Sequence, residues 1–460
     1  MTSTKRLRVK DGDTIKALLG LTLPIVAANI LQTAYQLTDT FWVGRLGAGA
    51  VAAVSLSFPV FFFVMSIAMG IGVAGSVLVA QYYGAKKPEA IDHAAGQTLV
   101  LMLVLSLVCG ALGYLLSAPV AKAIGAGPDI LADTVAYMQL SFAGILFLFG
   151  FFAYQSLVRG VGEVKVPAYI VLGTVLLNLI LDPLFIFGYG PIPAYGVTGA
   201  ALATIGTQGL ASIAGLYFLL SGKQGIRLRL KHLKPDWPVV RKLFRIGLPS
   251  SIEQGSRALG LVAMMVIVAT FGTIIVAAYG IGMRIFSFVI IPAVGLSLGT
   301  STLVGQRMGA GKPDEAEEIT RTSYQLGFWI LTIIGAMFYI FARPITAFFV
   351  PGELEVIRAG AAFLRIMSPV FGFLGIQMAL LGALRGAGDT KSSMILSLVS
   401  FWVIQLPVAF TLSKYTSLSY SGLWWAFPVS NVLTAILCWW WFGRGYWKHK
   451  KIVEYHSRGE

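Results

Sequence analysis

Charged residues are scarce in this sequence, and their scarcity excludes most classes of soluble protein. Only 12% of the 460 residues are Asp, Glu, Lys or Arg, whereas 57% are hydrophobic. Soluble domains carry about a quarter charged residues, so the composition does not fit an ordinary soluble enzyme or a disordered chain. It predicts an all-α integral membrane protein with many spans.

The residues that most metal sites and catalytic centres need are also few. The two cysteines, Cys109 and Cys438, lie far apart in apolar runs, so they form neither a disulfide framework nor a metal motif. The sequence has four histidines, no P-loop and no clustered Ser, His and Asp. We therefore expect a protein that is not an enzyme and that holds no resident metal or cofactor.

Apolar segments long enough to cross a bilayer, which takes roughly 20 residues, recur along the whole chain. They predict twelve transmembrane helices, at 17–43, 52–82, 97–117, 135–157, 166–188, 197–220, 243–270, 274–305, 323–342, 360–384, 393–412 and 420–443.

The basic residues alternate between the two sides that these spans define. If the N-terminus is inside, the inner segments hold 27 Lys and Arg and the outer segments hold six. Excess positive charge on the cytoplasmic side is the usual pattern of membrane proteins, so we expect a multi-pass plasma-membrane protein with both termini in the cytoplasm. This pattern explains most of the net charge of +15 without nucleic acid as a partner.

The two halves of the chain repeat each other at a nearly constant offset. LVAQYYGAKKPEA at 78–90 returns as LVGQRMGAGKPDEA at 303–316, and RGVGEVK at 159–165 returns as RGAGDTK at 385–391. We therefore predict two six-helix lobes related by an axis along the membrane normal, which suits alternating access. The predicted parts are an N-lobe at 1–220, a cytoplasmic linker at 221–238, a C-lobe at 239–446 and a cytoplasmic tail at 447–460.

Three of the twenty acidic residues fall within predicted spans: Asp39, Asp182 and Glu253. An ionised side chain at mid-bilayer costs about 2.5–3.5 kcal/mol on insertion scales, so each needs a reason. Glu253 and Arg257 are four residues apart on one helix, so we expect them to neutralise each other. Arg284 is more typical of a structural residue that bonds carbonyls or a neighbouring helix.

The two remaining acids, Asp39 and Asp182, belong to the first half, and each lies among polar residues at helical spacing. The polar residues are Gln32, Tyr35, Gln36 and Asp39 on the first span, and Asn178 and Asp182 on the fifth. Two interpretations are open. Either Asp39 is solvated near the outer end of span 1 and Asp182 caps a broken helix at the outer end of span 5, or the two acids share a cavity that binds a cation. Our hypothesis is the second, because a buried carboxylate takes up a proton or a cation such as Na⁺. Gln155 and Gln208 either line the same cavity or bridge helices.

These features resemble the multidrug and toxic compound extrusion (MATE) family, and most closely its DinF-like prokaryotic branch. The resemblance covers nearly the whole chain. It is carried by LTLPIVAANILQTAYQLTDTFWVGRLG (21–47), LVAQYYGAKKP (78–88), LVRGVGEVK (157–165), LLNLILDPLF (176–185) and ALRGAGDTK (383–391).

The resemblance implies two six-helix lobes around a V-shaped central cleft. It also implies a functional monomer that exports cationic or amphipathic organic compounds in exchange for H⁺ or Na⁺, with no cofactor beyond the coupling ion. By matching position, Asp39, Asn178 and Asp182 would bind the coupling cation. The lining residues would be Gln32, Tyr35, Gln36, Gln155, Thr204 and Gln208. Another branch of the family has essential acids on spans 7 and 10, but span 10 here has none.

Two other classes remain as alternatives. A lipid-linked precursor flippase of the same superfamily would need a cationic cavity, for which only Arg257 and Arg284 are available, and it often has extra spans. A membrane enzyme would need a catalytic cluster that the sequence lacks. The sequence does not identify the substrate or choose between Na⁺ and H⁺.

Overall fold

The computed structural model describes residues 11–450 and residue 452, and these residues form long apolar helices joined by short loops. Eleven of the described helices are long and apolar enough to cross a membrane, or twelve when one bent pair counts as a single span. The all-α membrane architecture is therefore confirmed. In the described part of the chain, β-structure is limited to one isolated bridge between Tyr189 and Ile192.

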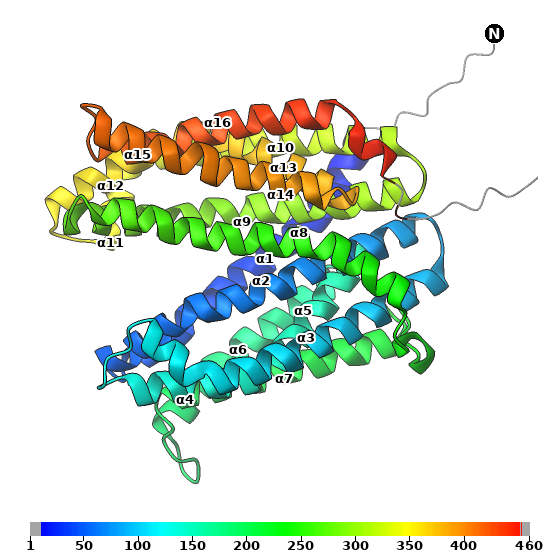
Figure 1. The fold of residues 1–460 in the computed structure, drawn as a ribbon, viewed down its shortest axis with the longest axis horizontal. Coiled ribbons are helices and arrows are strands. Elements are labelled where there is room, and N and C mark those ends of the chain that lie inside the picture. Colours follow the sequence, from blue (N-terminus) through cyan, green and yellow to red (C-terminus); the bar gives the residue numbers. More distant parts are fainter. Residues whose placement is uncertain (1–10, 451, 453–460) are drawn as a thin grey trace, which may run out of the picture. The chain divides into compact units, whose positions relative to one another are not determined.

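The helices match the predicted spans in order (Figure 1). They are α1 (Asp11–Gly44), α2 (Ala48–Gly84), α3 (Pro88–Ala123), α4 (Leu131–Ala143), α5 (Ile145–Gly160), α6 (Lys165–Phe187), α7 (Val197–Ser221), η1 (Leu230–Leu233), α8 (Trp237–Ala269), α9 (Thr273–Gly309), α10 (Pro313–Ile340), α11 (Ala342–Phe349), α12 (Leu354–Met367), η2 (Ser368–Val370), α13 (Phe371–Gly386), α14 (Thr390–Leu398), the π-helix η3 (Val399–Gln405), α15 (Leu406–Tyr415), α16 (Ser421–Gly443) and η4 (Tyr446–His449).

The sequence repeat is also a repeat of helix boundaries. Helices α2 and α9 have the same length, 37 residues, and α3 and α10 begin at equivalent prolines, Pro88 and Pro313. Proline suits the first position of a helix because its missing N–H would have no partner there. In the turn before each proline, Lys86 (φ 55°) and Gly311 (φ 72°) occupy equivalent left-handed positions.

The fourth predicted span is a broken helix. Helices α4 and α5 meet at Gly144 at an angle of 47°. A Cβ atom on Gly144 would lie 2.3 Å from Cγ1 of Ile205 on α7, so the glycine allows α7 to pack closely against the break. The sequence predicted one continuous helix at 135–157, because a single glycine in an apolar run is common in membrane helices.

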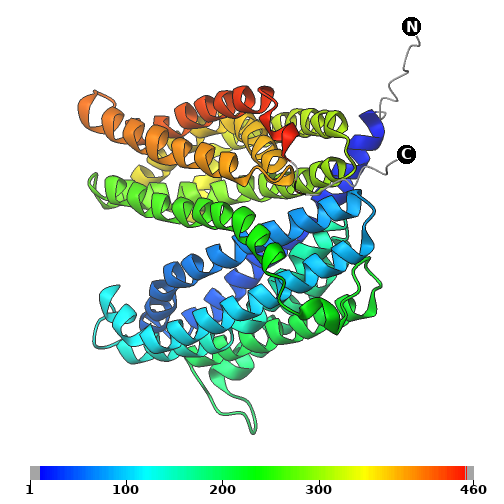
Figure 2. The same ribbon diagram turned by 45° about the vertical axis from the view of Figure 1, so that its right-hand side comes forward.

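The described chain divides into two compact units that differ in extent from the predicted lobes. Residues 27–258 form one unit, and residues 11–26 together with the described residues from 259 onward form the other. The chain therefore passes between the units inside α1 and inside α8, both of which are unbroken helices (Figure 1 and Figure 2). The predicted linker 221–238 lies wholly within the first unit, and the predicted tail 447–460 lies mostly outside the described residues.

Each unit contains the start of a helix whose remainder belongs to the other unit. Residues 27–258 include the start of α8, the first helix of the second sequence half, and the other unit includes the start of α1, the first helix of the first half. Within residues 27–258, a Cβ atom on Gly70 of α2 would lie 2.4 Å from the backbone N of Ser251 and 2.5 Å from the carbonyl O of Gly247, both on α8. In the other unit the equivalent Gly295 of α9 faces α1, where its Cβ would lie 2.5 Å from Cγ2 of Val26. The first helix of each half thus packs on the second helix of the other half, at the same position in the repeat.

Candidate functional site

The polar side chains of residues 27–258 gather where the second part of α1 and helices α4, α6 and α7 meet. Asn178 and Asp182 lie one turn apart on α6, and both are fully buried. The Asn178 side-chain amide Nδ2 donates a hydrogen bond of 2.7 Å to Oδ1 of Asp182. Because Asn178 lies on the same helix as the acid, its amide is held in place to stabilise one carboxylate oxygen.

A hydroxyl pair joins α1 to α7 beside these residues. The Tyr35 hydroxyl lies 2.9 Å from Oγ1 of Thr207, and the Thr207 hydroxyl donates to the carbonyl O of Ala203. Since the Thr207 proton is used in that bond, Tyr35 is the donor to Thr207. This bond fixes the ring of Tyr35 against α7.

Asp39 lies one turn after Tyr35 and interacts electrostatically with the acid on α6. Asp39 acts electrostatically on Asp182, and both acids act on the hydroxyls of Tyr35 and Tyr137. Asp39 is half-buried as a residue, but its Oδ1 atom is buried. Neither carboxylate has an ion-pair partner among the described residues. Two acids therefore share one region without a basic side chain to neutralise them.

Buried oxygen atoms without a hydrogen-bond partner mark this region. They are Oδ1 of Asp39, Oδ1 of Asn178, Oδ2 of Asp182 and Oε1 of Gln208. All four are acceptors when the acids are ionised. A proton, or a hard cation that prefers oxygen ligands, would satisfy them, whereas an anion would be repelled.

The other predicted lining residues lie outside this set of contacts. Gln36 is exposed, and Gln32 and Gln155 are half-buried. In the described part of the chain, none of these three side chains hydrogen bonds to the acids or to Tyr35. Their role as lining residues remains a prediction.

Tyr137 on α4 and Thr207 on α7 belong to the region although sequence reasoning did not select them. Thr207 gave no signal because a threonine in an apolar helix usually bonds its own backbone, as it does here. Tyr137 gave none because aromatic residues are plentiful along the chain, with 17 tyrosines in total.

The acid and the arginine of α8 lie next to each other. Oε1 of Glu253 lies 3.7 Å from a guanidinium nitrogen of Arg257, and Glu253 is buried. This agrees with mutual neutralisation as the interpretation of the pair. Arg284 on α9 is exposed.

Comparisons with known proteins agree with this architecture. The MatE family profile matches residues 24–184 and 249–411, two stretches that begin at equivalent positions of the repeat. A probable multidrug resistance protein of Bacillus subtilis, YoeA, is 30% identical and covers 94% of each chain. An FAD transporter of Shewanella oneidensis is 28% identical over 92% of this chain and 93% of its own.

The fold comparison gives the same result. An outward-facing structure of a multidrug resistance MATE family transporter of the MOP superfamily aligns with a TM-score of 0.89. It is 26% identical and covers 98% of this chain and all of its own. These similarities do not favour a lipid-linked precursor flippase. The chain belongs to the MatE family, the multidrug and toxic compound extrusion transporters, which is a family of membrane transporters and not of enzymes.

Proposed function

We propose that this transporter is an antiporter that exports cationic or amphipathic organic compounds in exchange for H⁺ or Na⁺. The coupling cation binds to Asp39 and Asp182, with Asn178 as a supporting ligand. One observation carries the proposal: two carboxylates without basic partners share a region with unpartnered buried oxygens.

The cost of burying charge explains why this region would bind a cation. An ionised carboxylate in an apolar interior without full compensation costs several kcal/mol. Asn178 stabilises only one oxygen of Asp182. A bound proton or Na⁺ would offset the remaining cost, so cation binding and the packing of α1, α6 and α7 are linked.

This linkage provides the step that an antiporter needs. A cation that binds one conformation better than the other shifts their equilibrium by its difference in affinity. To shift the ratio of the two conformations from 1:99 to 99:1, the cation must bind the favoured conformation about 10⁴-fold more tightly than the other. Occupation of the acids by H⁺ or Na⁺ would close the region around Tyr35 and Thr207 and release a positively charged substrate. Loss of the cation on the other side would return the protein to its drug-binding state.

The charge of the region favours a cationic substrate. The unpartnered buried oxygens of Asp39, Asn178, Asp182 and Gln208 outnumber the one unpartnered buried donor nearby, the Trp42 indole N–H, and the two acids lack ion-pair partners in the described residues. The Shewanella relative is named for FAD, an anionic molecule. A phosphate-bearing substrate would need basic groups that this region does not provide, so we expect a cationic dye to be exported in preference to FAD. We further propose a plasma-membrane location with both termini cytoplasmic, and a functional monomer.

Dye export from proteoliposomes tests the proposal. Ethidium and FAD are offered separately, with a pH gradient or a Na⁺ gradient as the only driving force. We expect ethidium to accumulate under at least one gradient and Asp39→Asn to abolish that accumulation without reducing expression. Asp133→Asn, which removes an exposed acid of α4, is the matched control and should transport normally. The proposal fails if Asp39→Asn accumulates ethidium like the wild type, or if FAD alone is moved.

A further inference from the structure

The segment between α7 and α8 packs on the protein through one of its two faces. Residues 224–229 alternate between buried and exposed positions, with Gln224, Ile226 and Leu228 buried and the residues between them exposed. Tyr154 donates a hydrogen bond of 3.0 Å to Oε1 of Gln224. Alternating burial shows that one side of this extended segment packs on the bundle and the other is free.

The next part of the segment is fastened to the start of α3. The Gln97 side chain donates to the carbonyl oxygens of His232 (2.8 Å) and Lys234 (2.7 Å), and its Oε1 accepts from the backbone N of Asp236 (2.8 Å). Both the amide nitrogen and the amide oxygen of one buried side chain are therefore used to hold the segment.

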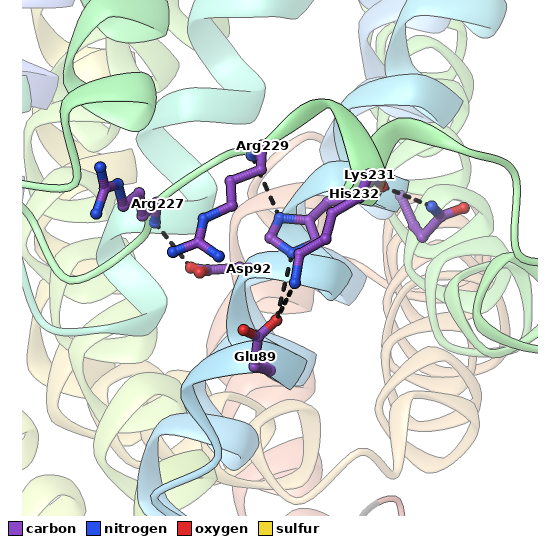
Figure 3. A network of polar contacts seen from close by, with 7 residues as sticks. Glu89, Asp92, Arg227, Arg229, Lys231 and His232 are labelled. Atoms are coloured by element: carbon purple, nitrogen blue, oxygen red, sulfur yellow. Dashed lines mark hydrogen bonds and ion pairs between the residues drawn. The ribbon is translucent and has the colours of Figure 1, made fainter.

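Acidic residues at the start of α3 add further contacts (Figure 3). Lys231 forms an ion pair of 2.9 Å with Glu89, and Asp92 accepts a hydrogen bond of 2.7 Å from the backbone N of Arg227. The second half of the chain has acids at the equivalent positions of the repeat. There Asp314 and Glu317 both contact Lys448, which follows the last long helix. An acidic pair that holds the basic segment after the sixth span is thus a repeated feature of the fold.

The free face of the segment combines cations with exposed apolar side chains. Leu230 is 86% exposed and Trp237 is 73% exposed, although both are large and apolar. The exposed basic residues around them are Arg227, Arg229, Lys231, Lys234, Arg241 and Arg245. Of these, only Lys231 forms an ion pair within the described part of the chain. We call this face, from Arg227 to Arg245, the linker surface.

We propose that the linker surface binds anionic phospholipid headgroups. Only residues 222–236 separate the end of α7 from the start of α8, and both helices are candidate membrane spans, so the surface cannot lie far from the bilayer. Clusters of Lys and Arg beside a span attract anionic lipids, and Trp prefers the membrane interface. Positive-inside topology alone explains basic residues, but it does not require them to be fixed in place beside exposed Leu and Trp.

The contacts with α3 would increase the affinity of this surface. A flexible segment loses conformational freedom when it binds, whereas one already held by Gln97, Glu89 and Asp92 loses less. Each Lys or Arg near an anionic surface contributes roughly a fivefold change in affinity. Three neutralised cations should therefore weaken binding on the order of 100-fold. The proposal concerns this surface alone and does not depend on the coupling site.

Native mass spectrometry of the full-length protein in a neutral detergent tests the proposal. Bound lipid is counted during titration with phosphatidylglycerol or phosphatidylcholine that have identical acyl chains. The triple variant Arg229→Gln, Lys234→Gln, Arg241→Gln is compared with a control of equal charge loss. The control changes three exposed cations away from this surface: Lys122→Gln, Arg343→Gln and Arg358→Gln.

We expect the wild type to bind phosphatidylglycerol at least tenfold more tightly than phosphatidylcholine. The linker variant should lose this preference and the control should keep it. Gln97→Ala should weaken the preference while every cation remains in place. The proposal is overturned if the wild type does not distinguish the two lipids, or if the linker variant and the control lose the preference equally. An unchanged preference in Gln97→Ala would overturn the role of the contacts with α3.

Discussion

Replacing Asp182 by Asn distinguishes a role of the carboxylate in transport from a role in stability, because the substitution removes the charge and keeps the shape of the side chain. Asp182 is fully buried and accepts a hydrogen bond of 2.7 Å from Asn178. A hydrogen bond to a charged group contributes about 1.5–3 kcal/mol. An ionised acid inside the membrane costs about 2.5–3.5 kcal/mol. These contributions oppose each other, so we expect Asp182→Asn to change the free energy of unfolding by no more than about 2 kcal/mol, toward higher stability.

The effect on transport should be large, because a neutral amide cannot exchange a proton and binds Na⁺ weakly. We expect cation-driven ethidium accumulation to fall to the level of protein-free liposomes. The Tm in detergent and dye accumulation in proteoliposomes are measured on the same preparations, with Asp133→Asn as the control. Accumulation at the wild-type level would refute the reasoning. A loss of several kcal/mol of stability would instead show that the carboxylate is a structural residue.

Three further substitutions test the packing around this region and the repeat. Tyr35→Phe removes the hydrogen bond from α1 to Thr207 and should lower the free energy of unfolding by about 0.5–1.5 kcal/mol. The measurement is the Tm, and an unchanged Tm would contradict the assigned hydrogen bond. Gly70→Ala places a Cβ atom against the α8 backbone and should cost about 1–3 kcal/mol; a wild-type Tm would contradict the close packing of α2 on α8. Gly311→Ala forces a left-handed conformation on a residue with a Cβ and should cost about 1–2 kcal/mol. Gly280→Ala, where an added Cβ meets nothing within 4 Å, is its control and should not destabilise the protein.

Periodicity was enough to predict the spans and the proximity of one polar pair. Asn178 and Asp182 are four residues apart on an apolar helix, and that spacing places them within hydrogen-bond reach. The motifs matched at a nearly constant offset predicted equivalent helices, and α2 and α9 agree in length.

Contacts between helices that lie far apart in the sequence were not predictable in this way. The repeat indicates which helices are equivalent but not which helix each one packs on, so the exchange of α1 and α8 between the units was not foreseen. The bond from Tyr35 to Thr207 joins residues 172 positions apart, and neither is unusual in its own helix. The break at Gly144 depends on Ile205, which is also distant in sequence.

Equilibrium binding of ethidium at varied cation concentration tests the central claim most directly. If cation and drug exclude each other through Asp39 and Asp182, each must weaken the binding of the other by the same factor. We predict that the apparent Kd for ethidium in the wild type rises with the concentration of the coupling cation, H⁺ or Na⁺, each varied separately. In the double variant Asp39→Asn, Asp182→Asn the Kd should no longer depend on either cation. A wild-type Kd that neither cation changes, or a double variant that keeps the wild-type dependence, would contradict the account.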